Sequence, residues 1–103
     1  MAEQNVFTVI GDPTRRRIMD LLRGGGHSVG ELADALGVAQ PNVSKHLRML
    51  GRASLVEARI DGPRRYYTLA PDGLRQLEAW LAPFREIWAD RLDALERHLD
   101  DLE

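Results

Sequence analysis

The chain has 103 residues, of which 44% are hydrophobic and 29% are charged, and this composition fits one globular domain with a thin hydrophobic core. It contains no cysteine, which excludes disulfide bonds, thiolate metal ligands and cysteine redox switches. No segment has the pattern of a signal peptide or of a membrane span, so we expect a cytoplasmic protein that does not contact a membrane.

The formal net charge is −2, but the charges are unevenly distributed along the chain. Residues 13–67 hold 10 Arg and Lys against 5 Asp and Glu, whereas residues 68–103 hold 4 Arg against 9 Asp and Glu. A basic body with an acidic tail suits a protein that contacts phosphate groups with one face only.

The N-terminal part predicts two helices. Gln4–Ile10 is an apolar-leaning segment that predicts a small helix. Asp12 and Pro13 indicate the start of a second helix over residues 13–23, because aspartate is a good N-cap and proline is favoured at the first helical position. At most one or two of Arg15–Arg17 can lie near a phosphate, because three consecutive residues cannot point the same way on a helix.

The next two helices form a helix-turn-helix pattern. Ser28 and Glu31 have the spacing of a capping box, which predicts a helix start at Ser28, and Gly37 is a good C-terminal stop. A tight turn then leads into a helix over residues 40–50. Two short helices joined by a turn that contains glycine are typical of a helix-turn-helix.

The helix over residues 40–50 has two distinct faces. Val43, Leu47 and Leu50 fall on one apolar stripe. The remaining surface offers small polar groups for base edges and cations for phosphates. An ordinary amphipathic surface helix fits this segment equally well when it is considered alone. The candidate contacts to DNA are Gln40, Asn42, Ser44, Lys45, His46 and Arg48, of which His46 borders the apolar stripe.

A β-hairpin is predicted after this helix. Residues 56–60 alternate between apolar and charged side chains, and Asp61-Gly62 is a hairpin signal before a second strand over residues 65–69. Such a ribbon beside a helix-turn-helix is a wing, although a hairpin that merely covers the core is an alternative. The candidate wing contacts to a minor groove or to phosphates are Arg59, Arg64 and Arg65.

The rest of the chain, residues 71–102, predicts one long helix of roughly 48 Å. Leucine and aromatic residues recur in it at spacings of three and four, as in a coiled coil. Pro83 predicts a kink or a break near Leu81–Pro83. So small a domain cannot bury this apolar stripe, which favours dimerisation. We name these residues the apolar seam: Leu74, Leu77, Leu81, Phe84, Trp88, Leu92, Leu95, Leu99 and Leu102.

Four motifs together resemble the ArsR/SmtB family of bacterial winged-helix repressors. They are GDPTRRRI at residues 11–18, GELA at 30–33, QPNVSKHLR at 40–48 and RYYTL at 65–69, and with them the resemblance extends in order over nearly the whole chain. It implies a mainly α fold with a small β-hairpin, namely a winged helix-turn-helix with a long C-terminal dimerisation helix. It also implies a homodimer whose two recognition helices lie roughly 34 Å apart on a pseudo-palindromic operator.

The resemblance divides this single domain into three parts. Residues 1–12 are the expected N-terminal dimerisation segment, residues 13–70 the helix-turn-helix and wing, and residues 71–103 the dimerisation helix. The expected dimer interface consists of Phe7, Leu81, Phe84, Trp88, Leu92, Leu95 and Leu99.

Two positions depart from the pattern of the family. Ala39 stands before Gln40 where relatives often have serine, and the loss of a side-chain cap costs about 1 kcal/mol. The chain has Ser54 within Ala53–Leu55 where relatives usually have glycine, and serine is less comfortable than glycine at positive φ.

Much of the family senses metals, but this chain offers poor ligands. The cysteine class of site is excluded. A second class uses Asp and His from the terminal helices, where this chain has Asp90, Asp93, His98 and Asp101. One histidine among carboxylates suits zinc or nickel poorly, so we expect neither a metal nor a cofactor. His27 is expected in an exposed loop.

The leading hypothesis is therefore a metal-independent, homodimeric repressor that binds double-stranded operator DNA, with an unknown inducer. The alternatives are a metal- or small-molecule-responsive repressor of the same family, or a winged-helix module for protein contacts. We do not expect an enzyme, because the sequence shows no nucleophile with a base, no phosphate loop and no metal cluster.

Overall fold

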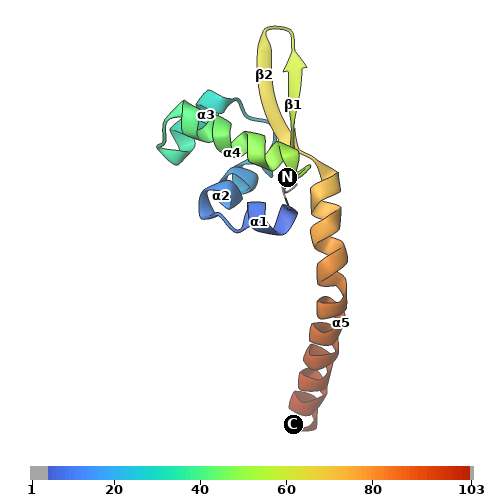
Figure 1. Ribbon diagram of the computed structural model, residues 1–103. Coiled ribbons are helices and arrows are strands. Elements are labelled where there is room, and N and C mark those ends of the chain that lie inside the picture. The colour runs from blue at the N-terminus through green and yellow to red at the C-terminus, as the bar shows by residue number, and fades with distance from the viewer. Residues whose placement is uncertain (1–4, 103) are drawn as a thin grey trace.

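The structure is a computed structural model that describes residues 5–102, and the expectations for residues 1–4 and 103 lie outside this range. Helices α1–α4 and the base of a β-hairpin form a small body, and α5 extends from it as a long rod (Figure 1). The mainly α fold with one hairpin is confirmed. The elements are α1 (Val6–Ile10), α2 (Pro13–Leu22), α3 (Val29–Leu36), α4 (Gln40–Arg52), β1 (Val56–Asp61), β2 (Arg64–Leu69) and α5 (Pro71–Asp101).

The predicted helix starts of α2 and α3 are confirmed. The Asp12 carboxylate accepts a hydrogen bond from the Arg15 amide at 3.0 Å, one turn into α2. In α3, the Ser28 hydroxyl accepts from the Glu31 amide at 3.1 Å, and the Glu31 carboxylate accepts from the Ser28 amide at 2.9 Å. Gly37 ends α3 in the left-handed conformation, with φ of 69°. Local side chains thus satisfy the amides that every helix start leaves without an intrahelical partner.

The two ends of α4 show both of the expected departures. Ala39 makes no side-chain cap. At the other end, the Ser54 amide donates to the Gly51 carbonyl and the Leu55 amide to the Leu50 carbonyl, each at 3.0 Å. This pattern is a Schellman motif, and Ser54 occupies its left-handed position with φ of 58°.

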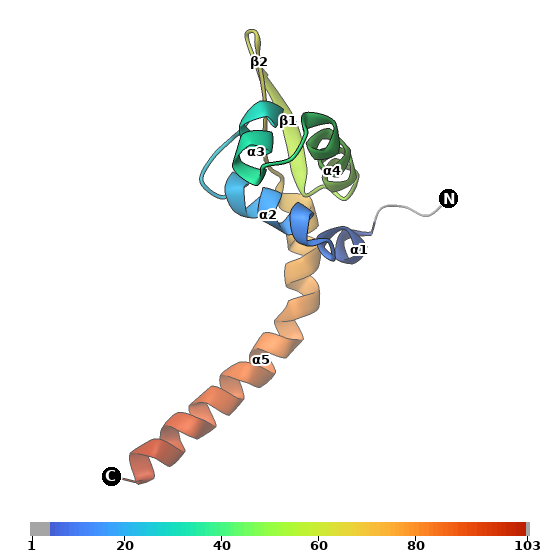
Figure 2. The same cartoon turned by 90° about the vertical axis from the view of Figure 1, so that its left-hand side faces the viewer.

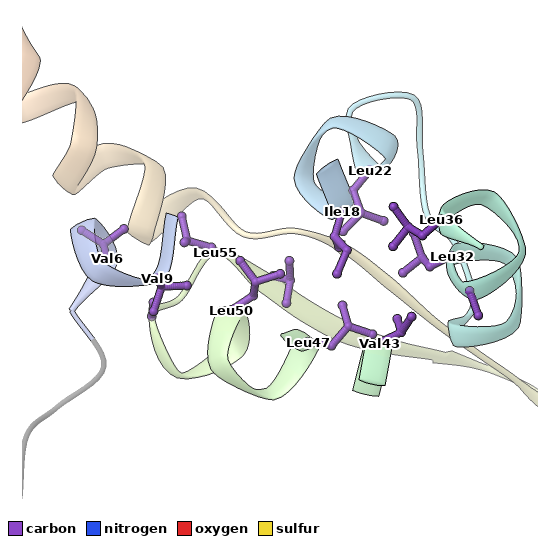
Figure 3. Packing of buried hydrophobic residues seen from close by; sticks show 13 residues of the cluster. Val6, Val9, Ile18, Leu22, Leu32, Leu36, Val43, Leu47, Leu50 and Leu55 are labelled. Carbon is purple, nitrogen blue, oxygen red and sulfur yellow. The ribbon is translucent and has the colours of Figure 1, made fainter. Parts of the chain in front are cut away.

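One hydrophobic core connects α1–α4 with the base of the hairpin. The α4 stripe of Val43, Leu47 and Leu50 is buried, as predicted, and it packs with residues of the other elements (Figure 3). Burying a side chain of this size contributes about 1.5–3 kcal/mol. The fully buried large residues are Val9, Ile18, Leu32, Val43, Leu47, Leu50 and Leu55.

The hairpin pairs β1 with β2 in antiparallel register, and each strand is one residue longer than predicted because Asp61 pairs with Arg64. Gly62 begins the two-residue loop with φ of 61°, as a type II′ turn requires. The His27 backbone pairs with Tyr67 through two hydrogen bonds of 3.1 and 2.8 Å. His27 lies in the connection between α2 and α3, as expected, but it is half-buried beside the wing and not fully exposed.

Helix α5 continues without a break through Pro83. Of the predicted kink or break, the break is therefore excluded, and the helix instead changes direction between its first turns and the rest of the rod (Figure 2). Its first turn packs closely on the end of α4, because the Gly73 amide donates to the Ser54 carbonyl at 2.8 Å. A Cβ atom at Gly73 would lie only 2.6 Å from the Ala53 carbonyl oxygen, so this approach requires glycine.

No helix in the described part of the chain combines the length and the apolar character needed to cross a membrane.

Replacement of Ser54 by glycine is expected to stabilise the fold by about 1 kcal/mol, because glycine adopts positive φ without the strain of a Cβ atom. Urea unfolding at a fixed protein concentration measures the change in the free energy of unfolding. Ser54→Ala is the matched control, because it removes the hydroxyl group but retains the strain. An equal gain from Ser54→Ala would contradict the explanation by backbone conformation.

Candidate nucleic-acid interface

The face of α4 opposite its buried stripe is basic. Lys45 and Arg48 are exposed on this face, as predicted from the helical spacing. Arg52 is also exposed and lies in the last turn of α4, one turn after Arg48, so it extends the same row of cations. The sequence reasoning missed Arg52, although its spacing of four from Arg48 and seven from Lys45 was available.

The smaller polar side chains of α4 lie on the two flanks of this basic face. With about 100° between successive residues, Gln40 and Ser44 fall on one flank and Asn42 on the other. Gln40 and Asn42 are exposed and Ser44 is half-buried. The Gln40 side chain lies over the start of α3, where a Cβ atom at Gly30 would be 3.4 Å from Gln40 Nε2.

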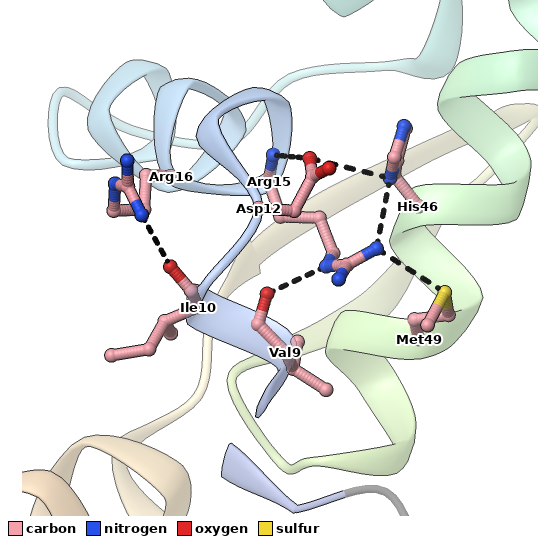
Figure 4. A network of polar contacts seen from close by, with 7 residues as sticks. All are labelled: Val9, Ile10, Asp12, Arg15, Arg16, His46 and Met49. Atoms are coloured by element: carbon pink, nitrogen blue, oxygen red, sulfur yellow. Dashed lines mark hydrogen bonds and ion pairs between the residues drawn. The ribbon is translucent and has the colours of Figure 1, made fainter. Parts of the chain in front are cut away.

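His46 points toward α2 and not toward the outer face. Its side chain is only 15% exposed, and its Nδ1 lies 4.0 Å from the Asp12 carboxylate. The same nitrogen lies 3.4 Å from Arg15 Nη1 (Figure 4). The structure thus separates His46 from Lys45 and Arg48, with which the sequence grouped it.

Two arginines of α2 bind backbone carbonyls of α1. Arg15 Nε donates to the Val9 carbonyl at 2.6 Å, and Arg16 Nη1 donates to the Ile10 carbonyl at 2.8 Å (Figure 4). Both carbonyls belong to the last turn of a five-residue helix, where intrahelical partners are missing. Arg15 and Arg16 therefore join α1 to α2.

The wing arginines are divided between the two faces of the hairpin. The strand register places Arg59 and Arg64 on one face and Arg65 on the other. The Arg59 guanidinium lies 2.6 Å from the Glu57 carboxylate. Arg65 lies over the Tyr67 ring, 5.7 Å from its centroid. The three side chains therefore do not form one cluster.

Arg64 connects the wing to the helix-turn-helix. Its guanidinium lies over the Tyr66 ring at 4.8 Å and is 3.8 Å from the Glu31 carboxylate of α3. Hydrogen bonding from the Ser28 backbone lowers the pKa of Glu31, so this carboxylate stays charged. The charge of Arg64 is thus partly offset before any contact with a ligand.

Hydrogen bonding to the Arg15 backbone is the main cause that lowers the pKa of Asp12. Its carboxylate therefore presents a negative charge to His46.

Within residues 5–102, no three His, Cys, Asp or Glu side chains gather closely enough to hold a metal ion. His98 and Asp101 are exposed near the end of α5.

Comparisons with known proteins identify the architecture that carries this surface. A family model described as a helix-turn-helix domain matches residues 10–59. The transcriptional repressor SdpR of Bacillus subtilis (strain 168) is 38% identical over 80 residues, which cover 78% of this chain and 89% of SdpR. The crystal structure of an ArsR family transcriptional regulator aligns with a TM-score of 0.68 and 31% identity, over 82% of this chain and 87% of that one. This chain belongs to the ArsR family.

A further solved structure is the solution structure of a homodimeric winged helix-turn-helix DNA-binding domain from Mycobacterium bovis, described as a possible ArsR-family transcriptional regulator. It aligns with a TM-score of 0.64 and 32% identity, over 79% of this chain and 75% of that chain. The assignment to this family of transcriptional regulators agrees with the order of the elements and with the basic outer face of α4.

In this ArsR-family chain, the residues predicted to form the dimer interface lie largely uncovered. From Leu81 onward, every residue of the apolar seam is between 44 and 69% exposed. Phe7 of α1 is 42% exposed and packs edge-on against Trp80, with 5.6 Å between ring centroids. The ring centroids of Trp80 and Phe84 are 4.8 Å apart. The sequence reasoning missed Trp80, which lies outside the three-and-four spacing of the seam.

Proposed function

We propose that the protein is a homodimeric repressor that binds a pseudo-palindromic operator through α4 of each protomer. The observation that carries this proposal is the division of α4 into a buried stripe and an exposed row of cations, Lys45, Arg48 and Arg52. Lysine and arginine bind phosphates, and the flanking Gln40, Asn42 and Ser44 offer donors and acceptors for base edges in a major groove.

The apolar seam supports the homodimer. A row of large apolar side chains that is more than two-fifths exposed marks an interaction surface. A second copy supplies the same row, so a two-fold axis can cover both rows at once. We therefore propose α1 and α5 as the dimerisation elements, and residues 13–70 as the unit that contacts DNA. In such a dimer the two α4 helices lie roughly 34 Å apart, which is one turn of DNA.

We further propose that DNA binding requires no metal ion. The absence of cysteine and the separation of the histidines along the chain support this proposal, because transition metals favour several nitrogen or sulfur ligands. The alternative is a metal-responsive repressor in which two copies of His98 and Asp101 combine across the dimer. In either case the protein acts as a DNA-binding regulator of the cytoplasm and not as an enzyme.

Fluorescence anisotropy tests this proposal with a labelled duplex from just upstream of the protein's own coding region. Binding is measured over a salt series, first with chelator and then with added zinc. We expect tight binding that weakens as the salt concentration rises, because binding to phosphates releases counterions. Neither the chelator nor zinc should change this binding. Release of DNA by zinc would instead support the site at His98. Binding no tighter than to random DNA would contradict an operator in this region.

Lys45→Ala is expected to weaken binding to all sequences and to lower the salt slope by about one, because one phosphate contact is lost. Ser44→Ala is expected to change which sequence is preferred, because we propose that Ser44 contacts base edges. Arg97→Ala provides the matched control, because Arg97 is an exposed cation near the far end of α5 and its loss should leave binding unchanged. The same uniform loss in Lys45→Ala and Ser44→Ala would contradict the assignment of base contacts.

A further inference from the structure

The Arg15 side chain connects three helices. It starts on α2, its Nε donates to the Val9 carbonyl of α1 at 2.6 Å, and its Nη1 reaches two acceptors on α4. These acceptors are His46 Nδ1 and Met49 Sδ, both at 3.4 Å (Figure 4). The Arg15 amide also donates to the Asp12 carboxylate. Within the described residues, no other side chain forms hydrogen bonds to both α1 and α4.

The chemistry of arginine suits this connection. The guanidinium group is planar, is always charged and holds five N–H donors in a fixed fork. It can therefore bind acceptors on two helices at once, which the single ammonium group of lysine does less well. Because arginine only donates, a hydrogen bond from Arg15 to His46 requires Nδ1 to accept, and the proton of a neutral His46 ring that makes this bond lies on Nε2.

The two helices that Arg15 connects have different roles. Helix α1 packs on α5 through Phe7 and Trp80, and it adjoins the proposed dimerisation surface. Helix α4 carries the basic row of Lys45, Arg48 and Arg52. With only five residues, α1 is too short to hold its orientation alone. Arg15 is thus positioned between the surface that pairs the protomers and the helix that contacts DNA.

We propose that Arg15 is a positioning residue for operator binding, which fixes α4 relative to α1 and thereby sets the distance and angle between the two α4 helices of the dimer. This inference rests on the proposed function. Binding to two half-sites at once requires a fixed geometry, because the second contact gains its strength from the first only when both can form together. Loss of the Arg15 connection should therefore affect an operator with two half-sites far more than one half-site.

Arg16 provides a matched control. It is the next residue on α2, it carries the same charge, and it donates to the neighbouring Ile10 carbonyl of α1 at 2.8 Å. Its side chain lies on the exposed side of α2, away from His46 and Met49 (Figure 4). A comparison of Arg15→Gln with Arg16→Gln therefore isolates the contact with α4 from the loss of one charge and one α1 contact.

The test uses the full chain and a duplex with two half-sites, selected by the wild-type protein from a random DNA library, together with a duplex that keeps one half-site. Arg15→Gln should weaken binding to the two-site duplex by about ten-fold or more, with a much smaller loss on the one-site duplex. Its salt slope should stay unchanged, because no phosphate contact is removed. Arg16→Gln should bind both duplexes like the wild type.

Arg15→Lys keeps the positive charge but removes the guanidinium group with its fixed set of donors. It also replaces Arg15→Gln in the test if that variant does not fold. It should show a selective loss on the two-site duplex as well, because the single ammonium group of lysine holds both helices less well. A spectroscopic measurement without DNA accompanies these variants. In ¹⁵N NMR spectra above the titration range of histidine, the His46 ring of the wild type should show a protonated Nε2, and both Arg15 variants should shift this ring toward a mixture of tautomers.

Three results would overturn the inference. One is wild-type binding by Arg15→Lys together with an unchanged His46 tautomer. Another is an equal loss on both duplexes with a salt slope lowered by about one, which identifies a phosphate contact. The third is an equal effect of Arg16→Gln. If the wild-type protein selects no duplex with two half-sites, the proposed function fails as well, and this result is distinguished because it does not depend on any variant.

Discussion

The apolar seam of α5 is the constraint on which the rest of the molecule depends. Only the first turns of this helix touch the body, where Gly73 and Leu77 pack on the end of α4 and on the core. From Leu81 to Leu102 the seam lies open along the rod that leaves the body. Full burial of each such side chain contributes about 1.5–3 kcal/mol, so burial of the seam strongly favours association. One chain alone cannot bury these side chains. A second copy offers an identical seam and satisfies it by symmetry.

Hydrogen bonds join α4, the proposed DNA-contacting helix, to the proposed dimerisation helices α1 and α5 at two points. At its C-terminal end, the Ser54 carbonyl accepts from the Gly73 amide at the start of α5. Along its side, His46 and Met49 contact Arg15, which is bonded to α1. Both connections are short, polar and directional, and they add to the apolar packing of the core behind α4. The placement of α4 in a dimer is therefore defined by specific hydrogen bonds as well as by packing.

Features with local causes could be predicted from the sequence, and features with tertiary causes could not. The caps at Asp12 and Ser28 follow from neighbouring residues, and the left-handed conformation of Ser54 was indicated by the glycine that relatives usually have at this position. The polar contact of His46 with Arg15 joins residues that are 31 positions apart. Pro83 removes one backbone hydrogen bond, but it lies on an exposed stretch where water can satisfy the released carbonyl. The helix therefore bends and does not break.

The most direct test of this account is the mass of the protein in solution. Sedimentation equilibrium of the wild type is predicted to give twice the mass of the chain. Leu95→Asp, within the seam, should give a single-chain mass with an intact helical circular dichroism spectrum at the concentrations tested. Ala94→Asp places the same charge one residue away, outside the seam, and should remain dimeric. A wild-type protein with the mass of one chain, or a dimer unaffected by Leu95→Asp, would contradict the claim that the apolar seam pairs the protomers.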